Sequence, residues 1–300
     1  MHLFRSLKTT LFVCAVILGS SALCRAEEER IILQGKETRT FEQMVDALSQ
    51  AAVVVVGEEH DHKQGHALEL EIFKGLFAKH ALMIFSLEMF ERDVQLVLDE
   101  YLSNQISKSS FLAASRPWQN YATDYAPLIE FCKDNYLPVL AANAPRRYVS
   151  IASRMGQSAL LKLSKQARSY LAKLPYSMVL PPEYDRALTD VFSNHGAASN
   201  AMLPQFPKEG QALWDATMAD SILRGLKTYG RIPIMQINGS MHSDYGYGLV
   251  DRLRKADRKI KVMIVSIKRD KAFPNIDPAQ YDKVGDFVIV TKDDTKKEEK

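Results

Sequence analysis

Two short motifs, far apart in the chain, place acidic and imidazole side chains directly after apolar runs. Gly57-Glu58-Glu59-His60 follows the run from Ala52 to Val56, and Gly239-Ser240-Met241-His242 follows the run from Ile232 to Ile237. A third apolar run, Leu82 to Leu87, is followed by Glu88. A carboxylate that emerges from an apolar strand is costly to bury unless it is paired, and an imidazole is a suitable partner. These residues therefore predict a site for acid–base chemistry or metal binding.

Apolar runs of this length, bounded by glycine or a charged residue, are typical of buried parallel strands. The carboxyl ends of parallel strands meet at one edge of a sheet, where ligands bind. We therefore expect one site shared by Glu58, His60, Glu88 and His242. In a hydrolase these four would be the catalytic residues, whereas a divalent transition metal would be held by His60, Glu88 and His242. His60 is the expected base or ligand, with Glu58 or Glu59 orienting its second nitrogen.

The rest of the chain alternates strand and helix patterns, which predicts an α/β fold with a mostly parallel sheet flanked by helices. Further strands are expected at Ile31–Leu33, an edge strand, and at Pro138–Ala142, Lys261–Ile267 and Asp286–Thr291. Residues 148–206 show helical stretches broken by proline and glycine, which predicts a smaller helical insertion subdomain. The α/β core then spans 27–147 and 207–291, and residues 292–300, which lack apolar side chains, form a charged tail.

Residues 1–26 have the pattern of a secretory signal peptide. Arg5 and Lys8 precede an uncharged apolar run that is shorter than the ~20 residues of a membrane-spanning helix. Cleavage after Ala26, or alternatively after Ala22, predicts an exported protein that is periplasmic or membrane-associated. A lipid anchor on Cys24 is the less favoured alternative, because Leu23 is large where a lipidation signal requires a small residue.

Removal of residues 1–26 lowers the formal net charge from +3 to 0, because this segment contains three basic residues and no acidic one. A mature chain without net positive charge offers no electrostatic basis for binding nucleic acid. It also keeps a single cysteine, Cys132, so an internal disulfide is excluded and stability must come from an ordinary core.

Two further groups of residues suggest binding rather than catalysis. Arg146 and Arg147 follow Pro145, which suits the first turn of a helix, so free amides and two guanidiniums predict an anion site for a carboxylate. A surface salt bridge is the alternative for this pair. His62 and His66 lie four residues apart and could form a two-imidazole metal clip, but the neighbours of His62 favour a solvated loop.

Five segments of the chain resemble, in the same order, the motifs of ChaN-like proteins, a haem-binding uptake group of the TIKI superfamily. They are Gly57-Glu58-Glu59-His60-Asp61 with His66 after it, Leu87-Glu88-Met89, Trp118 to Tyr125, Ala141-Ala142-Asn143-Ala144-Pro145-Arg146-Arg147, and Ile237 to Gly246. The similarity runs from about residue 30 to residue 268, so coincidence does not explain it.

The resemblance implies a secreted, often lipid-anchored protein that holds haem between two protomers through a tyrosine ligand with histidine support. Haem, a second copy of the chain and an outer-membrane haem receptor are the partners so implied. His66 lies in a matched motif, and Tyr245 and Tyr247, shortly after His242, are the first candidates for a phenolate ligand of ferric haem. Tyr121 and Tyr125 come second, because aromatic residues at their spacing more often pack in a core. Arg146 and Arg147 would hold the haem propionates.

Two functions follow from these patterns. Haem binding in an exported iron-acquisition protein ranks first, because the specific resemblance is to that branch. The wider superfamily resembles metal-dependent proteases and erythromycin esterases, which use a similar Glu-x-His motif, a second glutamate and a distal histidine. A hydrolase is therefore the alternative, although the sequence has neither a Gly-x-Ser-x-Gly nor a His-Glu-x-x-His motif.

Overall fold

The computed structural model describes residues 29–199 and 204–293. The predicted signal peptide, including Cys24, and most of the predicted charged tail lie outside the described residues. Within the described part of the chain, no helix is both long enough and apolar enough to cross a membrane.

An eight-stranded sheet forms the centre of this part of the chain, in the order β2-β1-β8-β7-β3-β6-β4-β5. The strands are β1 (Arg30–Gln34), β2 (Glu37–Thr38), β3 (Val53–Glu58), β4 (Ile84–Glu91), β5 (Val139–Asn143), β6 (Ile234–Gly239), β7 (Val262–Asp270) and β8 (Phe287–Lys292). All pairs from β8 to β5 are parallel, whereas β1 is antiparallel to both β8 and β2. The predicted α/β fold with a mostly parallel sheet is confirmed.

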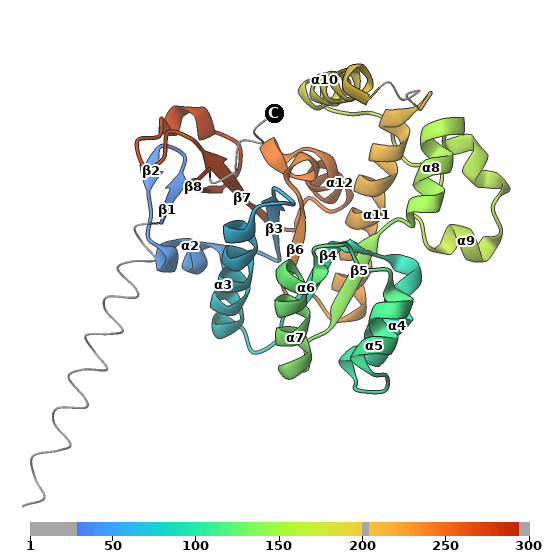
Figure 1. The fold of residues 1–300 in the computed structure, drawn as a ribbon, viewed down its shortest axis with the longest axis horizontal. Helices are drawn as coiled ribbons and strands as arrows, with labels where there is room; N and C mark the ends of the chain where they lie inside the picture. The colour runs from blue at the N-terminus through green and yellow to red at the C-terminus, as the bar shows by residue number, and fades with distance from the viewer. Residues whose placement is uncertain (1–28, 200–203, 294–300) are drawn as a thin grey trace, which may run out of the picture.

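The central strands are buried on both faces, which explains their continuous apolar sequences. Every residue of β3 and β6 is buried. The prediction of β1 as the edge strand was wrong. The two-residue strand β2 pairs outside it (Figure 1), and this strand is too short and too polar to show in the sequence pattern.

Helices cover both faces of the sheet (Figure 1). They are α2 (Phe41–Leu48), α3 (Lys63–Lys79), α4 (Gln95–Leu102), α5 (Lys108–Ser115), α6 (Tyr121–Asp124), α7 (Ala126–Asp134), α8 (Arg146–Met155), α9 (Lys165–Ser169), α10 (Pro182–Ser199), α11 (Pro207–Thr228) and α12 (Gly248–Ala256). One apolar core packs α2, α3, α4 and α7 against the sheet. A second core packs α11 and α12 against its other face. Short 3-10 turns complete the chain: η1 (Arg92–Val94), η2 (Gln157–Lys162), η3 (Ser240–His242), η4 (Asp244–Gly246) and η5 (Pro278–Tyr281).

The segment between β5 and α11 contains helices and loops but no strand in its described residues. Helices α8 and α9 lie at one end of the molecule, beside α11 (Figure 1). A third apolar cluster joins Val149 and Ala152 of α8 to Leu213 and Ala216 of α11. This segment therefore packs on a helix of the main fold, and α8 begins at Arg146, just before the predicted boundary at residue 148.

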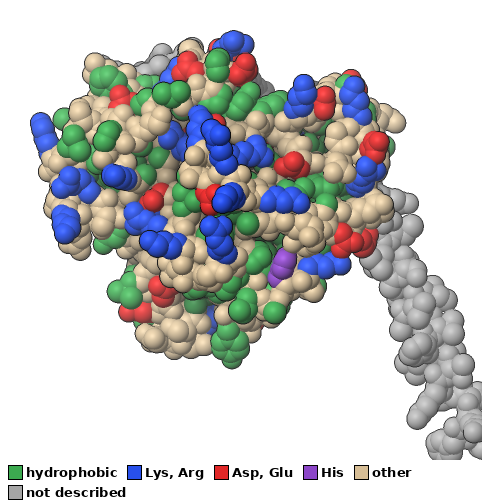
Figure 2. All heavy atoms as spheres, turned by 180° about the vertical axis from the view of Figure 1, so that it is seen from behind, with side chains coloured by type: hydrophobic (Ala, Val, Ile, Leu, Met, Phe, Trp, Pro, Cys, Tyr) green, Lys and Arg blue, Asp and Glu red, His purple; other side chains and the backbone are tan. Residues whose placement is uncertain are grey.

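Basic side chains on the face seen from behind are spread out, with acidic and apolar side chains among them (Figure 2). Helix α12, for example, pairs its Lys255 with Asp251 one turn earlier. Positive charge is thus compensated locally at this pair.

Candidate functional site

Three neighbouring strands bring the two sequence motifs together. β6 lies between β3 and β4 in the sheet, and Glu58 at the end of β3 is in register with Gly239 at the end of β6. The pairing of β4 with β5 shifts register between Leu87 and Glu91, so Glu88 sits at an irregularity of its strand. Such bulges re-aim side chains, and here Glu88 Oε2 accepts a hydrogen bond from the Gly239 amide at 2.8 Å.

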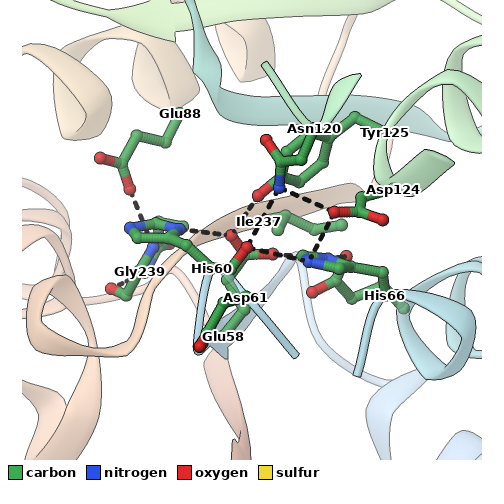
Figure 3. A network of polar contacts seen from close by, with 12 residues as sticks. Glu58, His60, Asp61, His66, Glu88, Asn120, Asp124, Tyr125, Ile237 and Gly239 are labelled. Carbon is green, nitrogen blue, oxygen red and sulfur yellow. Dashed lines mark hydrogen bonds and ion pairs between the residues drawn. The ribbon is translucent and has the colours of Figure 1, made fainter. Parts of the chain in front are cut away.

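Glu58 orients His60. The Oε1 atom of Glu58 lies 2.6 Å from His60 Nδ1, and it also accepts a hydrogen bond from the Tyr125 hydroxyl at 2.7 Å. Glu59, the other candidate for this role, instead pairs with Arg269 at 2.6 Å. Figure 3 shows His60 between Glu88 on one side and the group around Glu58 and His66 on the other.

Gly239 lets these groups approach one another. A Cβ at position 239 would lie 2.7 Å from His60 Nε2 and 3.7 Å from Glu88 Oε2. Contacts below about 3.0 Å essentially do not occur for real Cβ atoms. The site therefore requires glycine at this strand end, and His60 and Glu88 face each other across it.

His242 is held by two carboxylates. Its Nδ1 lies 2.6 Å from Asp215 Oδ1, and its Nε2 lies 3.5 Å from Glu88 Oε1. Asp215, in α11, is fully buried and accepts a second hydrogen bond from the Tyr184 hydroxyl at 2.9 Å. The structure thus brings Glu58, His60, Glu88 and His242 together in one polar cluster.

A pocket of about 470 Å³ opens onto this site. Its wall includes Glu58, His60, Glu88, Trp118, Arg146, Trp214, Gly239, Met241 and His242. The volume falls in the range of about 300–1,000 Å³ typical of small-molecule sites. Two imidazole rings of the pocket contact indole rings edge to face, His60 with Trp118 and His242 with Trp214.

Burial and charge set the protonation of the two histidines. Burial disfavours the imidazolium of His60, but the Glu58 hydrogen bond and the Glu88 charge outweigh it and raise the pKa. Burial likewise opposes charge on His242, yet the carboxylates of Glu88 and Asp215 raise its pKa to about 10. Against the effect of burial, hydrogen bonds with His60 and His66 lower the pKa of Glu58, and the contacts with His242 and His60 lower the pKa of Glu88. Near neutral pH the site therefore holds two carboxylates beside a protonated His242.

His66, assigned to haem by resemblance, lies in a buried cluster behind His60. Its Nδ1 is 3.2 Å from Glu69 Oε2 and 3.3 Å from Glu58 Oε2. Its Nε2 is 3.2 Å from the His60 carbonyl oxygen and 3.5 Å from Asp124 Oδ2. His62 takes no part, because its Nε2 contacts the Thr291 hydroxyl at 2.9 Å and its side chain is buried rather than solvated. The two-imidazole clip and the solvated loop expected for His62 were therefore wrong.

The two arginines of the predicted anion site have different surroundings. Arg147 pairs with Asp93 at 2.6 Å and stacks on Tyr148, so the salt-bridge alternative describes it. The first amide of α8, that of Arg146, already donates to Glu91 Oε1 at 3.0 Å. The side chain of Arg146 is exposed and lines the pocket. Only Arg146 thus faces the site.

Tyr245 and Tyr247 flank a second hollow of about 500 Å³, next to the pocket. Its wall consists of Glu183, Tyr184, Ala187, Ser240, Met241, Asp244, Tyr245 and Tyr247, and it shares Ser240 and Met241 with the pocket. We call this surface the tyrosine patch. Tyr245 is 52 % exposed, and its φ of 59° is uncommon for a residue other than glycine. Burial and the nearby Glu183 charge raise the pKa of Tyr247.

Tyr121 and Tyr125 belong to the core. Both are buried, and burial raises the pKa of each hydroxyl far above its usual range. Tyr125 packs edge to face against His66 while it donates to Glu58. Neither hydroxyl reaches a surface where a haem could lie.

Comparison with known families identifies the chain. A family profile described as haem-binding uptake, Tiki superfamily, ChaN matches residues 44–253, which is more than half of the sequence and includes both strand-end motifs. The chain belongs to the ChaN family. No curated protein sequence matches it.

The fold resembles that of a solved ChaN structure. A structure titled "Cofacial heme binding to ChaN of Campylobacter jejuni" superposes with a TM-score of 0.62 at 20 % identity, covering 89 % of this chain and 98 % of that one. An erythromycin esterase mutant, EreC, in its open conformation has a TM-score of 0.47 at 12 % identity, covering 86 % and 81 %. The ChaN similarity establishes the shared fold.

Two residues of this site escaped the sequence analysis. Asp215 and Glu69 are acidic residues on the buried faces of amphipathic helices. Tyr125 was named only as a second-rank haem ligand, and its contact with Glu58 was not foreseen. A signal existed for Glu69, because it lies three residues after His66 and beside the apolar positions Leu68 and Ile72 on the same helix face. Asp215 follows Trp214 in a similar apolar setting, but no neighbouring histidine in the sequence marks it.

Proposed function

We propose that this ChaN-family chain is an exported haem-binding protein of iron acquisition, and that Tyr245 in the tyrosine patch supplies the iron ligand. The observation that carries the proposal is the exposed hydroxyphenyl ring of Tyr245 beside an apolar hollow in a chain of a haem-binding uptake family. Ferric haem binds to phenolate oxygen in known proteins. Tyr247 is the weaker ligand, because its raised pKa disfavours the phenolate.

The residues of the patch fit haem. Met241, Tyr245 and Tyr247 offer apolar surface to a macrocycle, and a left-handed backbone conformation holds Tyr245 outward. A non-glycine residue in this conformation costs roughly 1–3 kcal/mol and is found preferentially at functional sites. Haem would supply the ferric ion, while this chain supplies the ligand oxygen and the apolar contact. Arg146 lines the adjoining pocket, which shares Met241 with the patch, and is a cation available to a propionate.

A second protomer completes the proposed site. The hollow is open, so a haem lying on it keeps one face toward solvent. The Campylobacter jejuni ChaN structure is titled for cofacial haem binding, which describes two haems face to face. Two copies of this chain, each with a haem on its tyrosine patch, would cover each other's exposed haem face. Dimerisation should then depend on hemin, and sedimentation with and without hemin measures it.

Substitution of exposed tyrosines tests the ligand. Tyr245→Phe should abolish the charge-transfer band of tyrosinate-ligated ferric haem, because it removes the oxygen and keeps the ring. Tyr136→Phe is the matched control, since Tyr136 is also exposed, at 87 %, and also has a positive φ. Tyr136 precedes the first residue of β5, whereas the pocket lies at the last residue of β5. A band that persists in Tyr245→Phe and in Tyr247→Phe would overturn this site.

Export is part of the same proposal. The first 26 residues support it by their pattern, and mass spectrometry of protein recovered from the periplasm reads the outcome directly. A mature chain that starts at Glu27 or Leu23 supports simple cleavage. Diacylglycerol on Cys24 would instead show a lipid-anchored protein, and a chain retained with its leader in the cytoplasm would contradict export.

A hydrolase is the second candidate, favoured by one observation. Glu58 binds Nδ1 of His60, which leaves Nε2 beside Gly239 at the pocket, the arrangement of an oriented general base. If the pocket turns over a substrate, His60→Gln should abolish hydrolysis of esters or peptides and leave the tyrosinate haem spectrum intact. Loss of the haem spectrum in this variant, with no hydrolysis by the unmodified protein, would argue against this second function.

A further inference from the structure

We propose that Glu58, His66 and Glu69 form a buried binding site for a divalent transition metal ion. The ligand atoms are His66 Nδ1 and one carboxylate oxygen from each glutamate, and all of them lie within 4.8 Å of one another. This site is separate from the haem surface, and it differs from the metal site that the sequence suggested at His60, Glu88 and His242.

The two oxygens of Glu58 face in different directions. Oε1 is fully engaged, by His60 at 2.6 Å and by the Tyr125 hydroxyl at 2.7 Å. Oε2 turns inward to His66 and has no hydrogen-bond partner. Glu69, which is completely buried, likewise leaves Oε1 without a partner. An unpartnered carboxylate oxygen in a protein interior is expensive, and two of them in one cluster call for a shared cation.

The tautomer of His66 suits a metal ligand. Nε2 lies 3.2 Å from the His60 carbonyl oxygen, which can only accept, so this nitrogen carries the hydrogen. When a metal ion replaces the hydrogen on Nδ1, the lone pair of this nitrogen points toward the two glutamates. Metal-bound histidines typically donate their other ring N–H to a carbonyl or carboxylate, and both kinds of group, the His60 carbonyl and Asp124, are present here.

The spacing within the cluster is also compatible with a bound ion. Nδ1 lies 3.3 Å from Glu58 Oε2 and 3.2 Å from Glu69 Oε2. Two donors bound at about 2.0–2.2 Å in tetrahedral geometry lie about 3.3–3.6 Å apart, so the ion would require only a small outward shift of the carboxylates. A charge-assisted hydrogen bond from an imidazolium would be shorter, at about 2.7–2.9 Å.

The net negative charge of the cluster also favours a bound cation. In the described part of the chain, neither Glu58 nor Glu69 forms an ion pair with a lysine or arginine, and Asp124 adds a third carboxylate beside His66. One imidazole and two carboxylates suit zinc and the neighbouring divalent ions. Such an ion would tie β3 to α3 and fix Glu58, which in turn orients His60.

Co²⁺ and Zn²⁺ added to haem-free protein, purified without a histidine tag, test the site. We expect one ion per chain by elemental analysis, visible ligand-field absorption with Co²⁺, and a higher unfolding temperature. Glu69→Gln and His66→Gln should each weaken binding by at least about 100-fold, because loss of an outer partner alone costs about 10- to 100-fold. Glu88→Gln removes a carboxylate of the other cluster and should keep the full equivalent.

Two results would overturn the proposal. Unmodified protein that shows neither Co²⁺ absorption nor a thermal shift would mean that a proton, not a metal, links the two glutamates. Metal retained in Glu69→Gln but lost in Glu88→Gln would move the ion to His242. The unmodified protein alone gives the first result, so a variant that fails to fold does not block the test. Because haem is absent throughout, neither result depends on the haem proposal.

Discussion

Asp215 Oδ1 lies 2.6 Å from His242 Nδ1, and this contact joins helix α11 to the turn η3 that follows β6. The same carboxylate accepts from Tyr184, whose ring stacks on Tyr247 of the tyrosine patch at 5.6 Å between ring centroids. The candidate haem surface and the buried histidine site are therefore physically connected through one acidic side chain.

This contact predicts a pH dependence of stability. The pKa of His242 rises from 6.5 to about 10 on folding, so its contribution is complete below pH 6.5 and is lost as the pH rises through about 10. Asp215→Asn should lower the free energy of unfolding by about 3 kcal/mol at the acidic end of this range. The difference in free energy of unfolding between the unmodified protein and Asp215→Asn should shrink as the pH rises toward about 10.

Urea unfolding at a series of pH values measures this difference. His66, whose pKa is also raised to about 10, titrates in both proteins and cancels in the comparison. A constant difference between the unmodified protein and Asp215→Asn across the whole range would show that His242 is not charged in the folded state.

Gly239→Ala should displace His60. The new methyl group would lie 2.7 Å from Nε2 and 2.9 Å from Cε1, so the ring must leave its position beside Glu58. We expect the pKa of His60 to fall toward its ordinary value, because Glu58 and Glu88 currently raise it. Overpacking of this kind costs roughly 1–3 kcal/mol of stability.

An NMR pH titration of the His60 ring reports this change, and Ser240→Ala is the neighbouring control that adds no atom at the site. An unchanged titration of His60 in Gly239→Ala would mean that the imidazole is not held against the end of β6.

Substitutions of the adjacent residues Arg146 and Arg147 should change haem affinity by different amounts. Arg146 lines the pocket next to the tyrosine patch, so Arg146→Ala should weaken hemin binding by about tenfold, the value of roughly 1.4 kcal/mol. Arg147→Ala should change it by less than about twofold, since Arg147 is committed to Asp93, and Asp93 keeps Arg116 as a partner. Equal losses in the two variants would contradict the proposed direction of the propionates.

Much of the fold and part of the site were predictable from the sequence, for identifiable reasons. The four successive valines of β3 and the apolar run of β6 must lie in a buried parallel sheet, and their carboxyl ends must meet. Glu58, His60 and His242 follow from this reasoning because each lies at or just beyond the end of a strand. Glu88 does not, because β4 continues to Glu91 and Glu88 lies at the irregularity within it. Strand order was not predictable, because which strands are neighbours depends on long-range packing.

The supporting residues were harder to predict. Asp215 and Glu69 contact their histidines from helices, and only the packing of α11 and α3 on the sheet determines which acidic residue reaches which imidazole. The different surroundings of Arg146 and Arg147 depend similarly on Asp93, which precedes them by more than fifty positions. The side chains of adjacent residues in a helix point in different directions, and the sequence pattern does not predict which of them forms an ion pair.

Titration of the purified mature protein with hemin, followed by visible absorption, tests the central claim most directly. We expect saturation at one haem per chain, with the charge-transfer band of tyrosinate-ligated ferric iron. We also expect no conversion to a six-coordinate bis-histidine form on reduction, because His66 and His242 are buried and bound to carboxylates. The absence of any spectral change at micromolar hemin, or a bis-histidine spectrum, would contradict it.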